Sequence, residues 1–323
     1  MSAPPRPPAD RPSSDRPIAP DPTALAAIAR LPLGRRGLAD GLLSGAHRGG
    51  RGGFSVEFAG HRPFQIGDDT RRIDWRKRRH VAAGTPVNGG WFVKQFEAES
   101  GLAVHLVVDA SSGMAYRGPA ADGGTGRHPS KWRVAATAAA TLTEAVLQRR
   151  DAASLTVLGG NRVTLPTSAA PAHAAAVCDT LSGILPSGKI DFAEALGTAA
   201  GRWGRRGVVV ILSDLLTDPD RWFAALSDLR RRGHEAAVLR VLAPAEVSFP
   251  FEKPRRFRPL TGDPAITGGG RAAVQEYRIA FEEHAAELAA ASRRVAAPLT
   301  VMTTDEPLSG ALVRFLSDRV GRA

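Results

Sequence analysis

Two short stretches of this sequence carry side chains that could bind a metal ion. Asp109-Ala110-Ser111-Ser112-Gly113 follows one buried apolar run, and Ser213-Asp214-Leu215 follows another. Because ligand sites of open α/β sheets lie at the carboxyl ends of strands, we expect Asp109 and Asp214 to lie near each other. Two carboxylates and the Ser111 hydroxyl are ligands that a hard cation such as Mg²⁺ prefers. Asp also caps turns and helices, and local spacing alone favours that structural role.

A second polar stretch, residues 64–79, combines turn residues with a dense basic cluster. Gly67-Asp68-Asp69 favours a turn. A basic cluster with one Trp is typical of a surface for an anionic partner, nucleic acid included. The acidic side chains between the arginines favour internal ion pairs for Arg71, its neighbour Arg72 and Asp74. The basic run at residues 77–79 stays open to a partner.

A third stretch, from Gly183 to Ile190, nearly matches the phosphate-binding loop of nucleotide-binding proteins. Ile190 stands where that loop needs a hydroxyl for Mg²⁺, and the stretch follows a predicted helix rather than a strand. Nucleotide binding there is therefore not predicted. The eight histidines include no i, i+4 pair beside a glutamate, and no Gly-x-Ser-x-Gly elbow surrounds Ser111, so neither a zincin site nor a hydrolase triad is supported.

The bulk composition describes a basic protein without a disulfide or an apolar membrane segment. The formal net charge of +11 favours acidic partners such as nucleic acid, an anionic membrane surface or an acidic protein. The single cysteine, Cys178, excludes an internal disulfide. No stretch approaches the roughly 20 apolar residues of a spanning helix, and the start of the chain lacks a signal-peptide pattern. We expect a cytoplasmic protein.

The pattern of apolar residues predicts three regions. Residues 1–22 are rich in proline and are predicted to form a disordered tail. Residues 23–100 are predicted to form an irregular, β-containing segment, with a short helix at residues 23–31 and strands at residues 54–58 and 91–96. Residues 101–323 are predicted to form the main domain, interrupted by an irregular excursion over residues 243–270.

Within the main domain, predicted strands and helices alternate. Such alternation is typical of a three-layer α/β fold with a doubly wound, mostly parallel sheet. The predicted strands cover residues 103–108, 155–158, 163–165, 208–212, 236–242 and 299–303. The predicted helices cover residues 130–149, 171–185, 192–203, 219–232, 272–294 and 308–320.

Several of these motifs together resemble the signature of the domain-of-unknown-function 58 family. The specific part is the block Gly67, Asp68, Asp69, Thr70, Arg71, Arg72, Ile73, Asp74 and Trp75, and the weaker parts are the stretch from Gly52 to Phe58, Asp109-x-Ser111, Ser213-Asp214-Leu215 and the late pair Tyr277 and His284. The resemblance runs from about Leu33 to near the C-terminus. It implies a von Willebrand factor A-like, Rossmann-type domain preceded by the family's own N-terminal segment. It implies no enzymatic activity. The role that it implies is that of a bacterial adaptor or assembly factor, and such proteins are often encoded beside MoxR-type AAA+ ATPases.

The resemblance also implies a metal-ion-dependent adhesion site (MIDAS), built from an Asp-x-Ser-x-Ser loop, a Thr on a second loop and an Asp on a third. Asp109 and Ser111 match the first loop, but Gly113 stands where its second Ser belongs. The second loop is Gly188-Lys189-Ile190-Asp191, with Ile190 at the Thr position, and Asp214 matches the third. The lost oxygen ligands should weaken Mg²⁺ binding. We therefore expect a degenerate site that acts as a partner-docking surface.

Three functional hypotheses follow. The first is a non-enzymatic adaptor or assembly factor that works with a MoxR-type AAA+ ATPase and a client protein that the sequence does not identify. The second is a nucleic-acid-associated basic protein that uses residues 77–79, whose binding would fall steeply with salt. The third is a metal-dependent hydrolase at Asp109 and Asp214, which is the weakest because no general base or nucleophile accompanies the pair.

Overall fold

The structure is a computed structural model that describes residues 17–31, 103–119, 128–203, 207–260 and 264–320, together with three strands between residues 56 and 98. The chain divides into two compact units. One is Gly50–Gly101, and the other combines Met1–Gly49 with Leu102–Ala323. The candidate site lies entirely in the larger unit.

The smaller unit contains a three-stranded antiparallel sheet in the order β1-β3-β2. Its strands are β1 (Val56–Pro63), β2 (Ile73–Arg78) and β3 (Trp91–Ala98). The strands predicted at residues 54–58 and 91–96 correspond to β1 and β3. Strand β2 was not predicted, because only Ile73 and Trp75 alternate with charged residues and the remainder of the stretch has the composition of a basic cluster.

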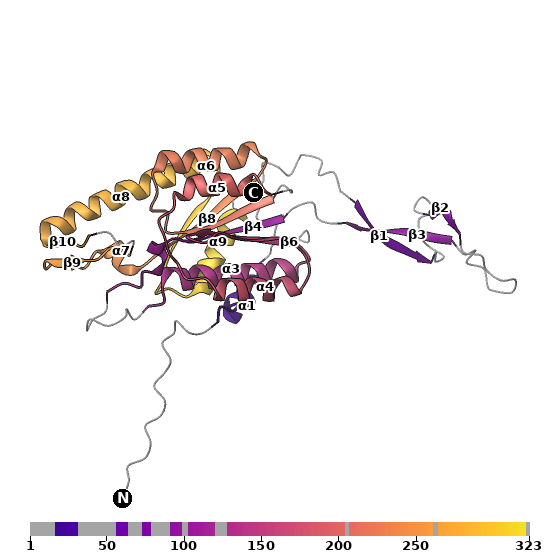
Figure 1. Cartoon of the computed structure of the whole chain (residues 1–323), viewed down its shortest axis with the longest axis horizontal. Coiled ribbons are helices and arrows are strands. Elements are labelled where there is room, and N and C mark those ends of the chain that lie inside the picture. Colours follow the sequence, from indigo (N-terminus) through magenta and orange to yellow (C-terminus); the bar gives the residue numbers. More distant parts are fainter. Residues whose placement is uncertain are drawn as a thin grey trace, which may run out of the picture. The chain divides into compact units, whose positions relative to one another are not determined.

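The larger unit is built on a six-stranded sheet in the order β11-β8-β7-β4-β5-β6 (Figure 1). Neighbouring strands are parallel, except that β6 at one edge pairs antiparallel with β5. The bounds are β4 (Ala103–Ala110), β5 (Ala152–Gly159), β6 (Val163–Ser168), β7 (Gly207–Ser213), β8 (Glu235–Leu242) and β11 (Leu299–Thr303). The predicted doubly wound, mostly parallel sheet is confirmed. The strand order reverses between β4 and β7, which is where ligands bind in such folds.

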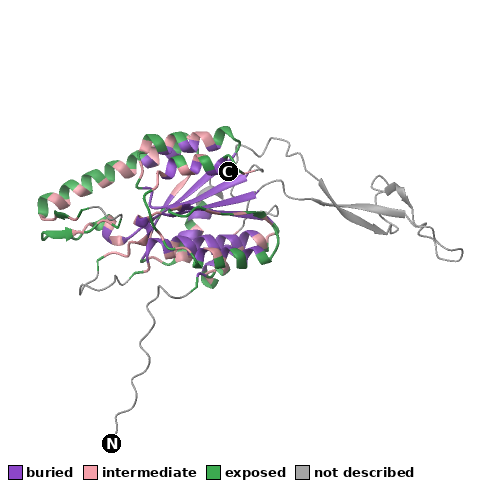
Figure 2. Ribbon diagram, in the orientation of Figure 1, coloured by how far each residue is buried: buried purple, intermediate pink, exposed green. Residues whose placement is uncertain are grey.

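Helices cover both faces of this sheet. Helices α1 (Pro22–Ala29), α3 (Lys131–Gln148), α4 (Ala172–Ser182) and α9 (Leu308–Val320) lie on one face, and α5 (Phe192–Ala200), α6 (Pro219–Arg231) and α8 (Arg271–Arg294) lie on the other. Along β4, Leu106 and Val108 join the first core, whereas Val107 joins the second. Since successive side chains of a strand point to opposite faces, continuous apolar strands such as these require a layer of helices on each side. Figure 2 shows the resulting buried central strands.

Helix α1 belongs to this α/β unit, which corrects the predicted domain boundaries. Asp21 caps the helix by accepting a hydrogen bond from the backbone N–H of Ala24 at 2.8 Å. Ile18 is buried, and its N–H donates to the Ser182 hydroxyl at 2.8 Å. The predicted tail over residues 1–22 is therefore too long. The grouping of residues 23–100 is also wrong, because Ile28 packs in the core of the larger unit.

The predicted excursion over residues 243–270 contains short regular elements. They are helix α7 (Pro244–Ser248) and a two-stranded antiparallel sheet of β9 (Arg255–Phe257) and β10 (Ile266–Gly268). Strands of three residues carry too little apolar alternation to be recognised from sequence. In the part of the chain that the structure describes, no helix combines the length and apolar character needed to cross a bilayer.

Candidate functional site

The two predicted carboxylates lie at the reversal point of the sheet. Asp109 is near the end of β4, Asp214 directly follows β7, and the two strands are paired neighbours. Both residues are only 3% exposed. Asp109 accepts hydrogen bonds from the Ser111 backbone N–H at 2.8 Å and from the Ser213 hydroxyl at 2.6 Å. The Asp109 carboxylate therefore closes its own loop and ties it to the end of β7.

The loop after β4 brings Ser111 and Gly113 to the Asp214 carboxylate. A Cβ atom built on Gly113 would lie 3.2 Å from Asp214 Oδ2 and 3.9 Å from Ser111 Oγ. The following 3-10 turn, η4 (Ser112–Ala115), is anchored to the second predicted loop, because the Ser112 N–H donates to the Gly188 carbonyl at 3.0 Å. The structure thus gathers the three loops at one edge of the sheet. We refer to residues 111–116, 183–191 and 214–218 as the strand-end face.

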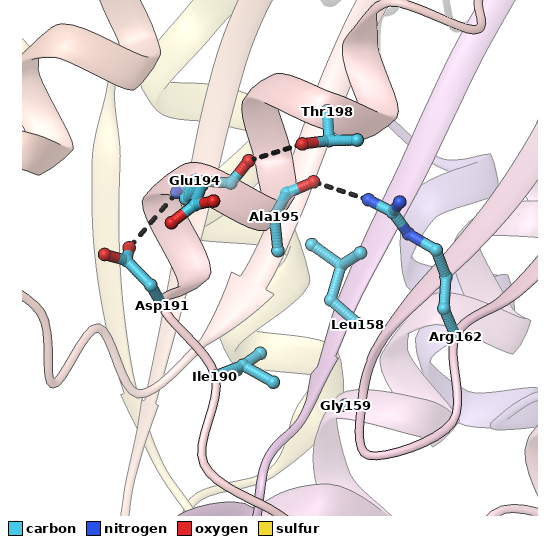
Figure 3. A pocket seen from close by; sticks show the side chains of 8 residues that line it. All are labelled: Leu158, Gly159, Arg162, Ile190, Asp191, Glu194, Ala195 and Thr198. Carbon is cyan, nitrogen blue, oxygen red and sulfur yellow. Dashed lines mark hydrogen bonds between the residues drawn. The ribbon is translucent and has the colours of Figure 1, made fainter.

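Ile190 faces an apolar environment where the resemblance would place a hydroxyl. It packs against the second core and lines an open pocket of about 350 Å³. Figure 3 shows the lining, which consists of Leu158, Gly159, Arg162, Ile190, Asp191, Glu194, Ala195 and Thr198. In this pocket Asp191 caps α5 through the Glu194 N–H, and the Arg162 guanidinium donates to the Ala195 carbonyl at 2.7 Å. The side chains of Asp191, Arg162 and Thr198 thus serve the local structure through bonds to backbone atoms of α5.

The sequence did not identify Lys131, which is the most buried charge at the site. Its ammonium lies 2.7 Å from Asp214 Oδ2 and 2.6 Å from Glu246 Oε1. The Lys131 side chain is only 1% exposed. Lys131 is the first residue of α3, directly after the capping residue Ser130, so the start of that helix delivers the ammonium to the end of β7. A lysine after a capping serine is usually exposed, and no signal in the sequence indicates its burial.

The charges of this network influence one another strongly. Burial raises the pKa of Asp109 to about 6, and the neighbouring Asp214 carboxylate adds to the effect. Burial by itself would lower the pKa of Lys131, but Asp214 and Glu246 outweigh it, and the pKa lies above its usual value. Burial, and to a lesser extent the charge of Glu246, raises the pKa of Tyr277 to about 12. At neutral pH the site therefore holds a charged Lys131 and a neutral Tyr277.

Two residues of the family resemblance, Tyr277 and His284, support the site loops from α8. The Tyr277 hydroxyl donates to the Glu246 carbonyl at 2.8 Å, and His284 Nε2 donates to the Leu215 carbonyl at 3.2 Å. Arg240, another buried residue that the sequence did not identify, donates from Nε to the Asp214 carbonyl at 2.9 Å. These bonds hold the backbone around Asp214 in place.

The carboxylate oxygens at this edge of the sheet are poor ligands for Mg²⁺. Asp214 Oδ2 already binds the Lys131 ammonium, and its Oδ1 accepts from the Leu216 N–H at 3.2 Å. Both oxygens of Asp109 are also hydrogen-bonded. A divalent ion would have to displace or closely approach a buried ammonium, and like charges repel strongly where water is excluded. Among the described residues, no three His, Cys, Asp or Glu side chains gather in a metal-binding group.

The specific family block of the sequence lies in the smaller unit. Gly67, Asp68, Asp69 and Arg71 lie outside the described residues, and Ile73, Asp74 and Trp75 belong to β2, whose side chains are not described. Lys77 and Arg78 also belong to β2, whereas Arg79 lies outside the described residues.

The strand order and the loops at its reversal point define a doubly wound α/β domain. The family model "Protein of unknown function DUF58" matches residues 60–288, and the chain belongs to this family. It is 30% identical over 313 residues to Rv1480 of Mycobacterium tuberculosis and to Mb1516 of Mycobacterium bovis, both described as uncharacterized proteins; the alignments cover 93% of this chain and 90% of each relative.

Solved structures similar to this chain include two from Bacteroides. The hypothetical protein BatB of Bacteroides thetaiotaomicron is 16% identical, with a TM-score of 0.42 over 68% of this chain and 99% of that one. An aerotolerance-related membrane protein of Bacteroides fragilis is 18% identical, with a TM-score of 0.43 over 69% of this chain and 100% of that one.

Proposed function

We propose that this protein is a non-enzymatic, cytoplasmic adaptor or assembly factor that binds a MoxR-type AAA+ ATPase and a client protein through the strand-end face. The ATPase partner is taken from the family resemblance, and the observation that carries the non-enzymatic docking role is the buried, hydrogen-bonded network at that face. The Lys131 ammonium forms ion pairs with Asp214 and Glu246. The Asp109 carboxylate accepts hydrogen bonds from Ser111 and Ser213. Catalysis needs an accessible base or nucleophile, and these side chains are committed to holding loops in place.

The surface above this network is suited to binding a protein. Leu216, directly beyond the Asp214 turn, is 65% exposed, and Leu185, in the second loop, is 85% exposed. Large exposed aliphatic side chains on rigidly held loops can supply apolar contacts to a protein partner. The buried hydrogen bonds below them keep the loops in one conformation, which lowers the entropic cost of binding.

In this proposal the docking face works without a divalent cation. The Lys131 ammonium supplies the positive charge that a bound Mg²⁺ would supply to Asp214, and it does so from inside the domain. Partner binding should then be insensitive to chelators. This deepens the degenerate-site hypothesis, which rested on Gly113 and Ile190 alone.

The experiment is co-purification of the tagged full chain with the ATPase encoded in the same organism, identified by mass spectrometry. Leu216→Ala should reduce recovery of the ATPase, whereas Ile279→Ala, an exposed aliphatic residue on α8 outside the strand-end face, should not. Asp109→Ala should reduce recovery as well, because it releases the loop after β4. Recovery should be equal with EDTA and with Mg²⁺. Failure of the wild-type chain to retain any MoxR-type ATPase would refute the adaptor proposal.

A second candidate function is association with nucleic acid. The net charge of +11 and the basic residues Lys77 and Arg78 on β2 favour it. Binding to duplex DNA that weakens steeply with salt, and that is lost when residues 77–79 are replaced by glutamine, would support this alternative. Absent or salt-insensitive binding would exclude it.

A further inference from the structure

The hairpin of β9 and β10 carries a concentrated group of exposed basic side chains. Residues 252–271 contain one lysine and four arginines against two acidic residues. The basic residues are Lys253, Arg255, Arg256, Arg258 and Arg271, and all five are exposed. Within the described residues none of the five takes part in an ion pair. We refer to residues 252–260 and 264–271 as the hairpin tip.

Exposed aliphatic side chains accompany these charges. Ile266 on β10 is 66% exposed, and Leu260, just beyond β9, is 53% exposed. Figure 1 shows β9, β10 and the N-terminal end of α8 projecting beyond the central sheet, and Figure 2 shows that this end is largely exposed. The tip is thus a projection that combines positive charge with apolar side chains.

An aromatic cluster holds the hairpin tip on the domain. The Phe249 ring stacks on Tyr277 with centroids 4.0 Å apart, and Phe251 meets the ring of Phe257 on β9 edge-on at 5.1 Å. Gly269, at φ 118°, closes the base, and a Cβ atom there would lie 2.6 Å from the Lys253 carbonyl. The tip is therefore presented by packed side chains rather than by a loose loop.

We propose that the hairpin tip binds the surface of an anionic phospholipid bilayer. Arginine and lysine bind anionic headgroups, and aliphatic side chains beside them enter the boundary of the acyl chains. Ile266 lies opposite Phe257 in the hairpin register, on the face that also carries Arg255. Phe257 of that face packs on Phe251, and Arg256 lies on the opposite face, so the exposed charges and the exposed Ile266 are distributed around a narrow projection. The binding is peripheral and independent of the strand-end face.

The exposed aliphatic side chains favour a bilayer over nucleic acid. Nucleic acid is bound through phosphate contacts and through aromatic rings that stack on bases, and the Phe251 and Phe257 rings of this segment pack on each other instead. Aliphatic side chains contribute little to phosphate binding. They contribute directly to insertion at a lipid surface.

The test is flotation of the full chain with vesicles of phosphatidylcholine, with and without phosphatidylserine. Wild type should float only with phosphatidylserine vesicles. Each basic residue near an anionic surface contributes about five-fold in partition, so joint replacement of Arg255, Arg256 and Arg258 by glutamine should lower it about a hundred-fold. Joint replacement of Leu260 and Ile266 by serine should lower it about ten-fold. All replaced side chains are largely exposed, and circular dichroism would verify that the variants fold.

The matched control replaces Arg230, Arg231 and Arg232, three exposed arginines around the end of α6, by glutamine. It removes the same charge from another place and should leave vesicle binding within about two-fold of wild type. The proposal is overturned if wild type ignores phosphatidylserine vesicles or if the control loses as much as the tip variant. It is also overturned if the serine variant binds like wild type, or if duplex DNA binds the tip more tightly than vesicles do.

Discussion

Replacement of Lys131 by methionine tests the buried network most directly. The change keeps the length of the side chain and removes its charge, which leaves the Asp214 side chain without its ammonium partner at 4% exposure. Removing one partner of a buried ion pair costs about 3–5 kcal/mol. Glu246 is 18% exposed and regains water more easily, so Asp214 accounts for most of the cost. At about 2–4 °C per kcal/mol for a domain of this size, the Tm should fall by roughly 6–20 °C.

The assay is thermal and urea unfolding of the full chain at pH 7.5. Lys253→Met, which removes an exposed lysine, should change the free energy of unfolding by less than about 0.5 kcal/mol. The double variant Lys131→Met with Asp214→Asn should recover at least about 1 kcal/mol, because asparagine carries no charge that needs Lys131. A Lys131→Met variant as stable as the Lys253→Met control, or a double variant with no recovery, would refute the reasoning.

Three further predictions use the same structure. Because the pKa of Asp109 is raised in the fold, from 3.8 to about 6, its ionisation destabilises the folded state progressively as the pH rises through that window. The stability of Asp109→Asn relative to wild type should therefore rise by about 1–2 kcal/mol from pH 5 to pH 8 in urea titrations; a constant difference across this range would contradict the pKa. Mg²⁺, Mn²⁺ and EDTA should each leave the Tm of wild type unchanged, whereas a saturable rise with Mn²⁺ that Asp214→Asn abolishes would establish a metal site. Ile28→Ala should cost about 2–4 kcal/mol in chemical unfolding if α1 belongs to the α/β core, whereas an effect below about 1 kcal/mol would separate α1 from it.

The arrangement of the main domain follows from local sequence patterns. Continuous apolar runs such as residues 207–213 indicate strands that are covered on both faces. Because amphipathic helices alternate with these strands along the chain, the pattern predicts a doubly wound sheet. The same patterns put Asp109 and Asp214 at strand ends, where the structure has them. The predicted domain boundaries were wrong at α1, where only a few residues pack in the core. Ile18, Ala24 and Ile28 are buried in the core at α1, although the proline-rich sequence before them is typical of a disordered tail.

The sequence by itself determined which residue types occupy the strand ends, and therefore that Gly113 and Ile190 supply no hydroxyl there. Only the tertiary structure decided what satisfies the carboxylates. Lys131 and Glu246 are separated from Asp214 by 83 and 32 positions in the chain, and no local pattern links them. Their meeting depends on how α3 packs against the sheet and α7 against α8. Burial then converts an ordinary lysine after a capping serine into the cation of the site, because a charge excluded from water must be matched by charges nearby.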